Sequence, residues 1–177
     1  MSSFAKNIIR FCLFILVQVY VLNQVPPLHE LVTPYLYFLF ILWLPFKMGR
    51  RTIMVLAFAI GFCLDCFTKT YGLHTAPCVL IAYVRPFLIN LLISQEGAES
   101  NYNEPSIKSM GFTPYFTYVA ILTLLHHTML YFLQALQAGG YLYFILKVLI
   151  STAVSLLLIL LTELLFVRKQ RFRTNTV

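Results

Sequence analysis

The sequence predicts an all-α membrane protein, a polytopic bundle of six transmembrane helices with both termini in the cytoplasm. The first observation behind this prediction is composition: 60% of the 177 residues are hydrophobic, 11% are charged, and the mean hydropathy is +0.82. A soluble core of this size cannot hide so much apolar surface. The second is that the apolar residues form six stretches near the length at which a helix crosses about 30 Å of hydrocarbon. The third is the placement of basic residues between these stretches.

Six helices are expected in chain order, over residues 8–25, 31–46, 52–71, 73–93, 112–137 and 141–167. The first follows Lys6 and Arg10 as the apolar part of a secretory signal peptide would, but no small-residue cleavage site precedes Pro26. Because five more apolar stretches follow, we expect it to remain as a helix. Residues 94–111 are polar and carry three glutamates, which predicts a cytoplasmic linker. With a basic cytoplasmic tail over residues 168–177, the chain is expected to be a single integral membrane domain.

Lysine and arginine positions predict the orientation of the bundle. With both termini inside, only Lys69 falls in an outside loop, while Arg85 and Lys147 lie within helices. The ten inside residues are Lys6, Arg10, Lys47, Arg50, Arg51, Lys108, Arg168, Lys169, Arg171 and Arg173. This bias follows the rule that cytoplasmic loops of membrane proteins are positively charged. The net charge of +7 therefore reflects topology, and we expect no nucleic-acid partner.

The cysteines raise the question of redox chemistry. Cys63-x-x-Cys66 has the spacing of a reactive dithiol, as in a membrane thiol oxidoreductase. Such an enzyme passes electrons through a second, outward-facing pair, whereas Cys12 and Cys78 lie in apolar stretches. Cysteine is also an ordinary small packing residue. Structural cysteines are therefore the favoured interpretation, and redox chemistry is the alternative.

The adjacent histidines of the fifth helix, His126 and His127, raise the question of a metal site. Neighbouring helical residues point about 100° apart, and neither residue has a carboxylate or thiolate one turn away. A hydrogen bond across the bundle is the favoured interpretation. The sequence contains no recognisable nucleophile, phosphate-binding loop or carboxylate pair, so we expect no metal, no cofactor and no enzymatic activity.

Four charged residues within the helices are expected to form a buried polar network, because a charge in hydrocarbon needs a partner or water. Counting about 1.5 Å per helical residue places Asp65 and Lys147 at similar depths below the outer boundary. The same count places Arg85 and Glu163 within reach of each other near the inner boundary. Two ion pairs are predicted, and the alternative is that the longer side chains reach the interfaces individually.

Small residues and prolines gather in the third and fourth helices. Ala57 and Gly61 are four residues apart, which permits close approach of a neighbouring helix. Pro77 and Pro86 each remove an amide donor from the fourth helix and favour a kink. A bent helix beside a closely packed one would form a ligand pocket or a groove for a partner, and ordinary intramolecular packing explains the small residues equally well.

The stretch "TPYLYFLFILWLPFKMGRRTIMVLAFAIGFCLDCFTKTYGLHTAP", residues 33–77, resembles the core of MreD, the small rod shape-determining membrane protein of bacteria. That family has a proline-led second helix ending in an aromatic residue and Leu-Pro, then a basic turn, a glycine four residues before an aspartate, and a glycine that opens the fourth helix. The matching residues are Trp43, Leu44, Pro45, Gly61, Asp65 and Gly72. The loop after Asp65 is shorter than the family pattern, and the linker before the fifth helix is longer.

The resemblance implies a non-enzymatic scaffold of the cell-elongation complex in the bacterial cytoplasmic membrane, supporting peptidoglycan synthesis. Its implied partners are the membrane helix of MreC and, through that complex, the filament MreB, the glycosyltransferase RodA and a penicillin-binding transpeptidase. The family is also similar in helix arrangement to the substrate-binding subunits of vitamin transporters. The alternative function is therefore a small-molecule-binding subunit of an importer.

Overall fold

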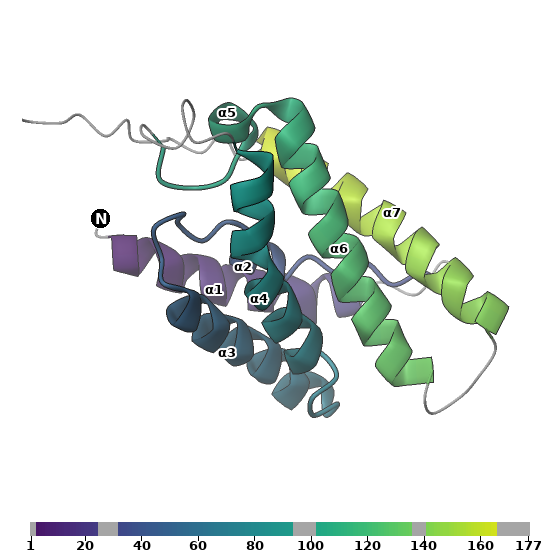
Figure 1. The fold of residues 1–177 in the computed structure, drawn as a ribbon. Coiled ribbons are helices and arrows are strands. Elements are labelled where there is room, and N and C mark those ends of the chain that lie inside the picture. Colours follow the sequence, from purple (N-terminus) through teal and green to yellow (C-terminus); the bar gives the residue numbers. More distant parts are fainter. Residues whose placement is uncertain (1–2, 25–31, 94–101, 136–140, 166–177) are drawn as a thin grey trace, which may run out of the picture.

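The computed structural model describes residues 3–24, 32–93, 102–135 and 141–165, and the regular structure within these ranges is helical. Figure 1 shows the elements in chain order. They are α1 (Ser3–Tyr20), the 3₁₀ turn η1 (Leu22–Gln24), α2 (Leu39–Leu42), α3 (Arg50–Thr68), α4 (Thr75–Leu92), α5 (Ile107–Met110), α6 (Phe112–Ala135) and α7 (Tyr141–Leu165).

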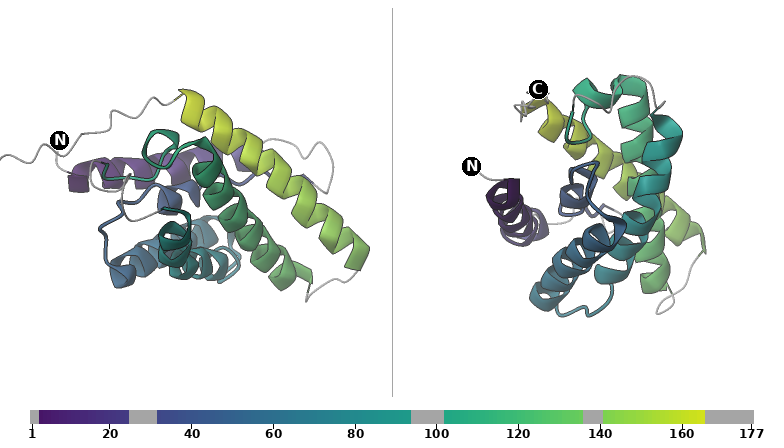
Figure 2. Two further views of the ribbon diagram at one scale, coloured as in Figure 1. Left: turned by 45° about the horizontal axis from the view of Figure 1, so that its top comes forward. Right: turned by 60° about the vertical axis from the view of Figure 1, so that its left-hand side comes forward.

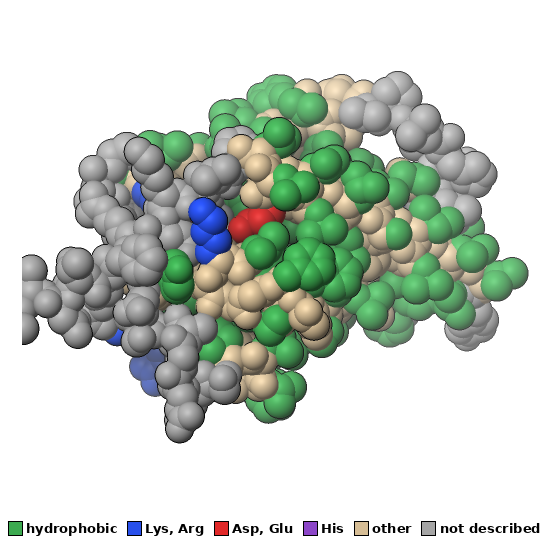
Figure 3. All heavy atoms as spheres, turned by 90° about the horizontal axis from the view of Figure 1, so that it is seen from above, with side chains coloured by type: hydrophobic (Ala, Val, Ile, Leu, Met, Phe, Trp, Pro, Cys, Tyr) green, Lys and Arg blue, Asp and Glu red, His purple; other side chains and the backbone are tan. Residues whose placement is uncertain are grey.

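Five stretches in the described ranges are long and apolar enough to cross a membrane: α1 continued through η1, and α3, α4, α6 and α7. Their outer faces carry large apolar side chains, such as Phe87, 67% exposed, and Leu142, 73% exposed. A soluble protein rarely exposes apolar surface on this scale. On the face in Figure 3, the charged side chains lie toward the end that holds the start of α1, and hydrophobic ones cover the other end. These features are those of a multi-pass membrane protein.

The predicted second transmembrane helix, residues 31–46, is wrong. Within its described part the chain has no regular structure over residues 32–36, turns, forms only the four-residue α2, and is irregular again to residue 49. Pro34 and Pro45 bracket this region and each lacks an amide donor, which leaves room for only a short helix between them. Residues 33–46, which we call the threaded segment, pass through the middle of the bundle instead.

Burial makes this irregular backbone compatible with a membrane. The side chains of residues 37–44 are between 0% and 5% exposed. Non-helical backbone at membrane depth is tolerated where protein surrounds it and supplies its hydrogen bonds. In the right-hand view of Figure 2 the threaded segment lies between α1 on one flank and the hairpin of α6 and α7. The helices therefore form a shell around a piece of their own chain.

The bundle has two distinguishable ends. At the first, Arg10 pairs with Glu104, and the backbone amide of Phe46 donates to the carbonyl of Asn103 at 2.9 Å. At the second, Thr33 lies against Tyr131 in the last turns of α6 and Ser151 near the middle of α7, and Tyr35 lies beside His74, which contacts Asp65. We call these the Glu104 end and the Asp65 end. The threaded segment runs from the Asp65 end to the Glu104 end, so it crosses the length of the bundle.

The two prolines of α4 have different effects. Pro77 is the third residue of the helix, where the amide has no partner within the helix, so it does not interrupt the hydrogen bonding there. This corrects the expectation that Pro77 frees a carbonyl inside the helix. Pro86 does lie inside α4. It has no amide N–H, so the carbonyl of Ala82 loses the hydrogen bond that it would otherwise accept within the helix.

Candidate functional site

The threaded segment is held by polar side chains from the helices around it. Gln18 of α1 is fully buried. Its Oε1 accepts hydrogen bonds from the backbone amides of Leu36 at 2.8 Å and Tyr37 at 3.4 Å, and its Nε2 donates to the carbonyl of Pro34 at 3.2 Å. The side-chain amide of Gln18 thus supplies the hydrogen-bond acceptor and donor that other backbone groups would have supplied if the segment were helical.

Two serines of α7 hold the start of the segment. Ser151 Oγ accepts from the amide of Thr33 at 3.4 Å, and Ser155 Oγ accepts from the amide of Tyr35 at 3.1 Å. Both serines are fully buried. They are four residues apart, so they lie on one face of α7, and they bind the amides of two residues that are two positions apart in the segment.

The C-terminal side of α2 is held by α4 and α6. The hydroxyl of Tyr118 donates to the carbonyl of Leu42 at 3.0 Å. Arg85, only 1% exposed, donates through its guanidinium to the carbonyl of Leu44 and through Nε to the Tyr118 hydroxyl at 3.0 Å. The last carbonyls of a helix have no donor within the helix, and here Arg85 and Tyr118 supply the hydrogen-bond donors.

The predicted ion pair between Arg85 and Glu163 is not formed in the described structure. Glu163 instead accepts a hydrogen bond from the hydroxyl of Tyr115 at 3.0 Å, and that hydroxyl accepts from Nε1 of Trp43 at 3.1 Å. Arg85 donates to the carbonyl of Leu44 instead, because the irregular backbone beside it needs hydrogen-bond donors. Both residues therefore serve the threaded segment, each through a separate set of hydrogen bonds.

Asp65 joins α3 to α4 and does not pair with Lys147. Its two carboxylate oxygens accept from the backbone amides of Gly72, His74 and Thr75 at 2.9, 2.9 and 3.0 Å. They also accept from the Thr75 hydroxyl at 2.5 Å and contact Nδ1 of His74 at 2.9 Å. A carboxylate in this position satisfies the first amides of a helix and complements its dipole.

Lys147 lies elsewhere. Its Nζ is 5.1 Å from the ring centre of Tyr131 and 5.6 Å from that of Tyr143. The similar depths expected for Lys147 and Asp65 do not bring them together, because the turn following Asp65 supplies donors from residues within ten positions of it.

Gly61 lets α4 begin against α3. A Cβ atom at Gly61 would lie 2.6 Å from the Cα of Thr75 and 2.8 Å from the carbonyl oxygen of His74. Only glycine fits such a backbone approach. Ala57, fully buried one turn earlier, continues the close contact face, and Gly72 in the connecting turn has a φ of +89°, which favours glycine.

A cluster of aromatic and histidine rings surrounds the start of the threaded segment. The ring of Tyr35 lies 5.6, 6.4 and 5.9 Å, centre to centre, from His74, His126 and His127. Nε2 of His126 is 2.8 Å from the hydroxyl of Tyr37, and this is a hydrogen bond across the bundle. His127 is 2.8 Å through Nδ1 from the carbonyl of Thr123. Within the described ranges, three His, Cys, Asp or Glu side chains do not converge as a metal site would require.

The four cysteines are free thiols spread over three helices. Cys63 is half-buried and Cys66 exposed on α3, while Cys12 is exposed on α1 and Cys78 is buried on α4. Cys63 and Cys66 are not bonded to each other.

Sequence reasoning missed the residues that hold the threaded segment, namely Gln18, Tyr118, Ser151 and Ser155. The available signal was a set of polar side chains inside otherwise apolar stretches, which in a membrane indicates a buried hydrogen-bonding role. In comparisons with known proteins, no family model, curated protein or solved structure matches the chain.

Proposed function

We propose that the chain is a non-enzymatic membrane scaffold of the MreD type, which binds the single membrane helix of MreC in the elongation complex of a rod-shaped bacterium. The observation that carries this proposal is that the centre of the bundle is occupied by the chain itself. Side chains of residues 37–44 fill it at 0% to 5% exposure. A bundle whose centre is filled is suited to presenting its outer surface to other proteins.

The proposal includes a topology of six passes with both ends in the cytoplasm of the bacterial inner membrane. Five passes are helical, and the threaded segment is the sixth. Lys6, Arg10, Lys47, Arg50 and Arg51 belong to chain segments at the Glu104 end. This basic end is the one that the positive-inside rule assigns to the cytoplasm.

The buried polar groups also favour a scaffold over an enzyme. Gln18, Ser155, Tyr118 and Arg85 each form a hydrogen bond to a backbone atom of the threaded segment. Asp65, the acid that the sequence singles out, is engaged by the first turn of α4. Groups used in this way stabilise one arrangement of the chain. A platform for MreC and, indirectly, for MreB, RodA and a transpeptidase requires such a fixed arrangement.

The residues that resemble the MreD pattern support the proposal because they work together. Gly61 permits the approach of α4, Asp65 binds the amides at its start, and Gly72 supplies the turn between them. Trp43, in the Leu-Pro motif of the pattern, is 5% exposed and donates to Tyr115. The resemblance thus falls on a set of residues that shapes the fold.

Affinity purification of the tagged full chain, co-produced with an MreC homologue, tests the proposal. We expect the single-span partner to co-purify at a fixed ratio and a cell lacking its own MreD to regain rod shape. An MreC variant with an unrelated membrane helix is the matched control and should be lost. A small metabolite that co-purifies while MreC does not would overturn the proposal in favour of the importer subunit.

A further inference from the structure

Three basic side chains lie at or just before the start of α3, and no carboxylate of the described residues pairs with them. Lys47, Arg50 and Arg51 are all exposed. The neighbouring cations of α1 differ, because Lys6 and Arg10 pair with Glu104 at 3.0 and 2.9 Å. Among the described residues, the ion pairs with Asp or Glu do not include any of the three. Within the described ranges, this cluster is therefore a patch of exposed positive charge at the Glu104 end.

Arg50 is held in a fixed position within the cluster. Its guanidinium carbon lies 3.9 Å from the ring centre of Tyr83, and one terminal nitrogen donates to the Tyr83 carbonyl at 3.1 Å. Tyr83 is 52% exposed on the outer face of α4. A guanidinium has five N–H donors in a planar fork that suits a phosphate group. Stacking on Tyr83 orients this fork at the protein surface before any ligand arrives.

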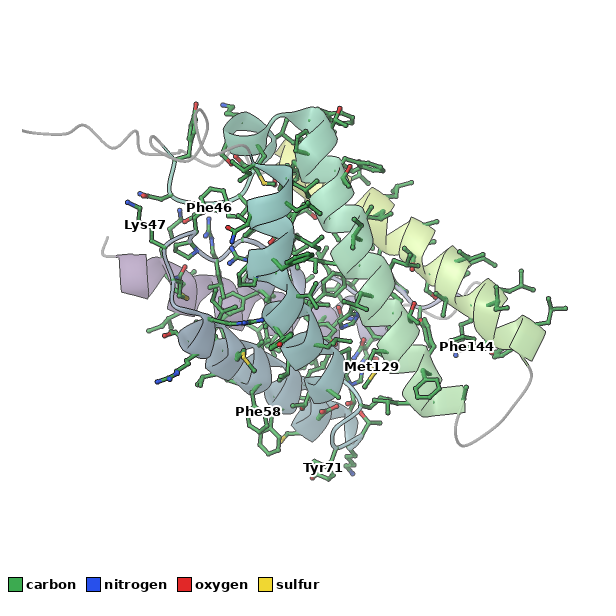
Figure 4. All side chains as sticks on the ribbon, in the orientation of Figure 1. Phe46, Lys47, Phe58, Tyr71, Met129 and Phe144 are labelled. Atoms are coloured by element: carbon green, nitrogen blue, oxygen red, sulfur yellow. The ribbon has the colours of Figure 1, made fainter. Side chains whose placement is uncertain are left out.

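One apolar stripe, on α3, begins after Arg51 and runs toward the Asp65 end. On α3, Val55, Phe58 and Phe62 follow Arg51 at helical spacing and are 66%, 51% and 46% exposed. The rings of Phe58 and Phe62 stack with their centres 5.7 Å apart. Figure 4 shows Phe58 directed away from the bundle, and Lys47 beside Phe46 in the loop that precedes α3. A molecule lying on this surface would meet cations at one end and hydrocarbon along its length.

We infer that Arg50 binds the phosphate of an anionic phospholipid, that Lys47 and Arg51 add positive charge beside it, and that an acyl chain lies along Val55, Phe58 and Phe62. Charge complementarity identifies the headgroup class, since a zwitterionic lipid brings its own ammonium group to the cluster. The adjoining apolar stripe identifies a lipid as the source of the phosphate. Basic residues at a membrane surface attract anionic lipids, and here the cation–π contact of Arg50 adds a fixed geometry. The inference requires membrane insertion only and goes beyond the scaffold role.

Native mass spectrometry of the purified full chain, offered equal amounts of phosphatidylglycerol and phosphatidylcholine, tests the inference. We expect phosphatidylglycerol to be retained preferentially. Replacing Lys47, Arg50 and Arg51 together by Gln should lower this preference by about fivefold for each cation removed. Tyr83→Leu keeps all three charges and should lower the preference by a smaller factor, because Arg50 loses its stacking partner.

Lys69→Gln and Lys108→Gln are the matched controls, since both remove an exposed cation outside the cluster. An equal loss of preference in these controls, or none in the triple variant, would overturn the inference. Displacement of phosphatidylglycerol by inorganic phosphate at matched ionic strength would also overturn it, because the site would then bind a soluble anion. Should the triple variant fail to fold, the single variants Arg50→Gln and Tyr83→Leu decide the question. A chain that keeps its lipid preference but does not bind MreC would contradict the scaffold proposal alone.

Discussion

The α3–α4 joint and the threaded segment solve the same problem by different means. Both contain backbone amides and carbonyls that a continuous helix would have paired. At the joint, the partners of Asp65 are five to ten residues away in the chain. In the threaded segment, the amide of Tyr35 is bound by a serine 120 residues away, and the amide of Leu36 by a glutamine 18 residues away. One region is built from local sequence and the other from the assembled bundle.

This difference predicts how each region responds to damage. The joint concentrates several donors on one carboxylate, so a single substitution there should be severe. The threaded segment distributes its hydrogen bonds over α1, α4, α6 and α7, so a single substitution should be milder. The following variants, ordered from the largest expected effect to the smallest, test this contrast through the free energy of unfolding in mixed micelles.

Asp65→Ala should have the largest effect. It leaves the amides of Gly72, His74 and Thr75 buried without an acceptor, and each unsatisfied group costs about 1–3 kcal/mol. The loss should be on the order of 5 kcal/mol, and abundance in the membrane should fall with it. Asp65→Asn retains one acceptor oxygen and should lose less.

The double variant Asp65→Ala with Lys147→Met distinguishes two roles of Asp65: binding the amides at the α3–α4 joint, and the ion pair with Lys147 that their similar depths suggested. Since Lys147 lies against Tyr131 and Tyr143, its replacement should not recover stability, and the two losses should add. Partial recovery in the double variant would mean that the two charges are paired in the membrane.

Gly61→Ala should be the next most severe change. Its new Cβ would lie 2.6 Å from a backbone atom of Thr75, so α4 has to move away from α3. Overpacking of this kind costs about 1–3 kcal/mol, and the upper part of that range is expected because the obstructing atoms are main chain. Gly49→Ala is the matched control, since the nearest atom to its Cβ would be 3.9 Å away. Equal tolerance of the two variants would contradict the close approach of α3 and α4.

The sequence predicted the close helix approach at Gly61 but assigned Asp65 to Lys147 instead of to the amides at the start of α4. Gly61, Asp65 and Gly72 lie within one helical hairpin, where the local chain geometry determines which residues come into contact. Five of the expected helices correspond to long helices of the structure for the same reason, because each satisfies its backbone internally.

The prediction for residues 33–46 was wrong because their composition matches that of a transmembrane helix. Their apolar side chains would suit hydrocarbon, and only the assembled bundle provides Gln18 and Ser155 as partners for their backbone. The predicted ion pairs failed similarly. Depth along a helix axis limits which charges can meet. Arg85 and Asp65, however, form hydrogen bonds with nearby backbone groups. The prediction of continuous helices treated the hydrogen bonds of those backbone groups as already formed.

Gln18→Leu should have an intermediate effect within the threaded segment. It removes the acceptor for the amides of Leu36 and Tyr37 and the donor to the carbonyl of Pro34. Because these bonds are to neutral groups, a loss of about 2 kcal/mol is expected. Hydrogen exchange at the Leu36 and Tyr37 amides should speed up while exchange at the Asp65-bound amides stays unchanged. Loss of protection at both places would show that the two regions unfold as one unit.

Ser155→Ala should have the smallest measurable effect, because it removes one acceptor from the amide of Tyr35 at 3.1 Å and one longer contact, at 3.3 Å, with Nε2 of His127. One buried amide without a partner corresponds to about 1 kcal/mol. Thr162→Val is the matched control on the same helix, because its hydroxyl bonds only to the carbonyl of Leu158 in α7 itself, which also accepts a helix hydrogen bond. Ser155→Ala should therefore accelerate exchange at Tyr35, and Thr162→Val should leave it unchanged. If both variants behave alike, α7 does not hold the threaded segment, and the distribution of its hydrogen bonds over several helices is refuted at the point where sequence separation is greatest.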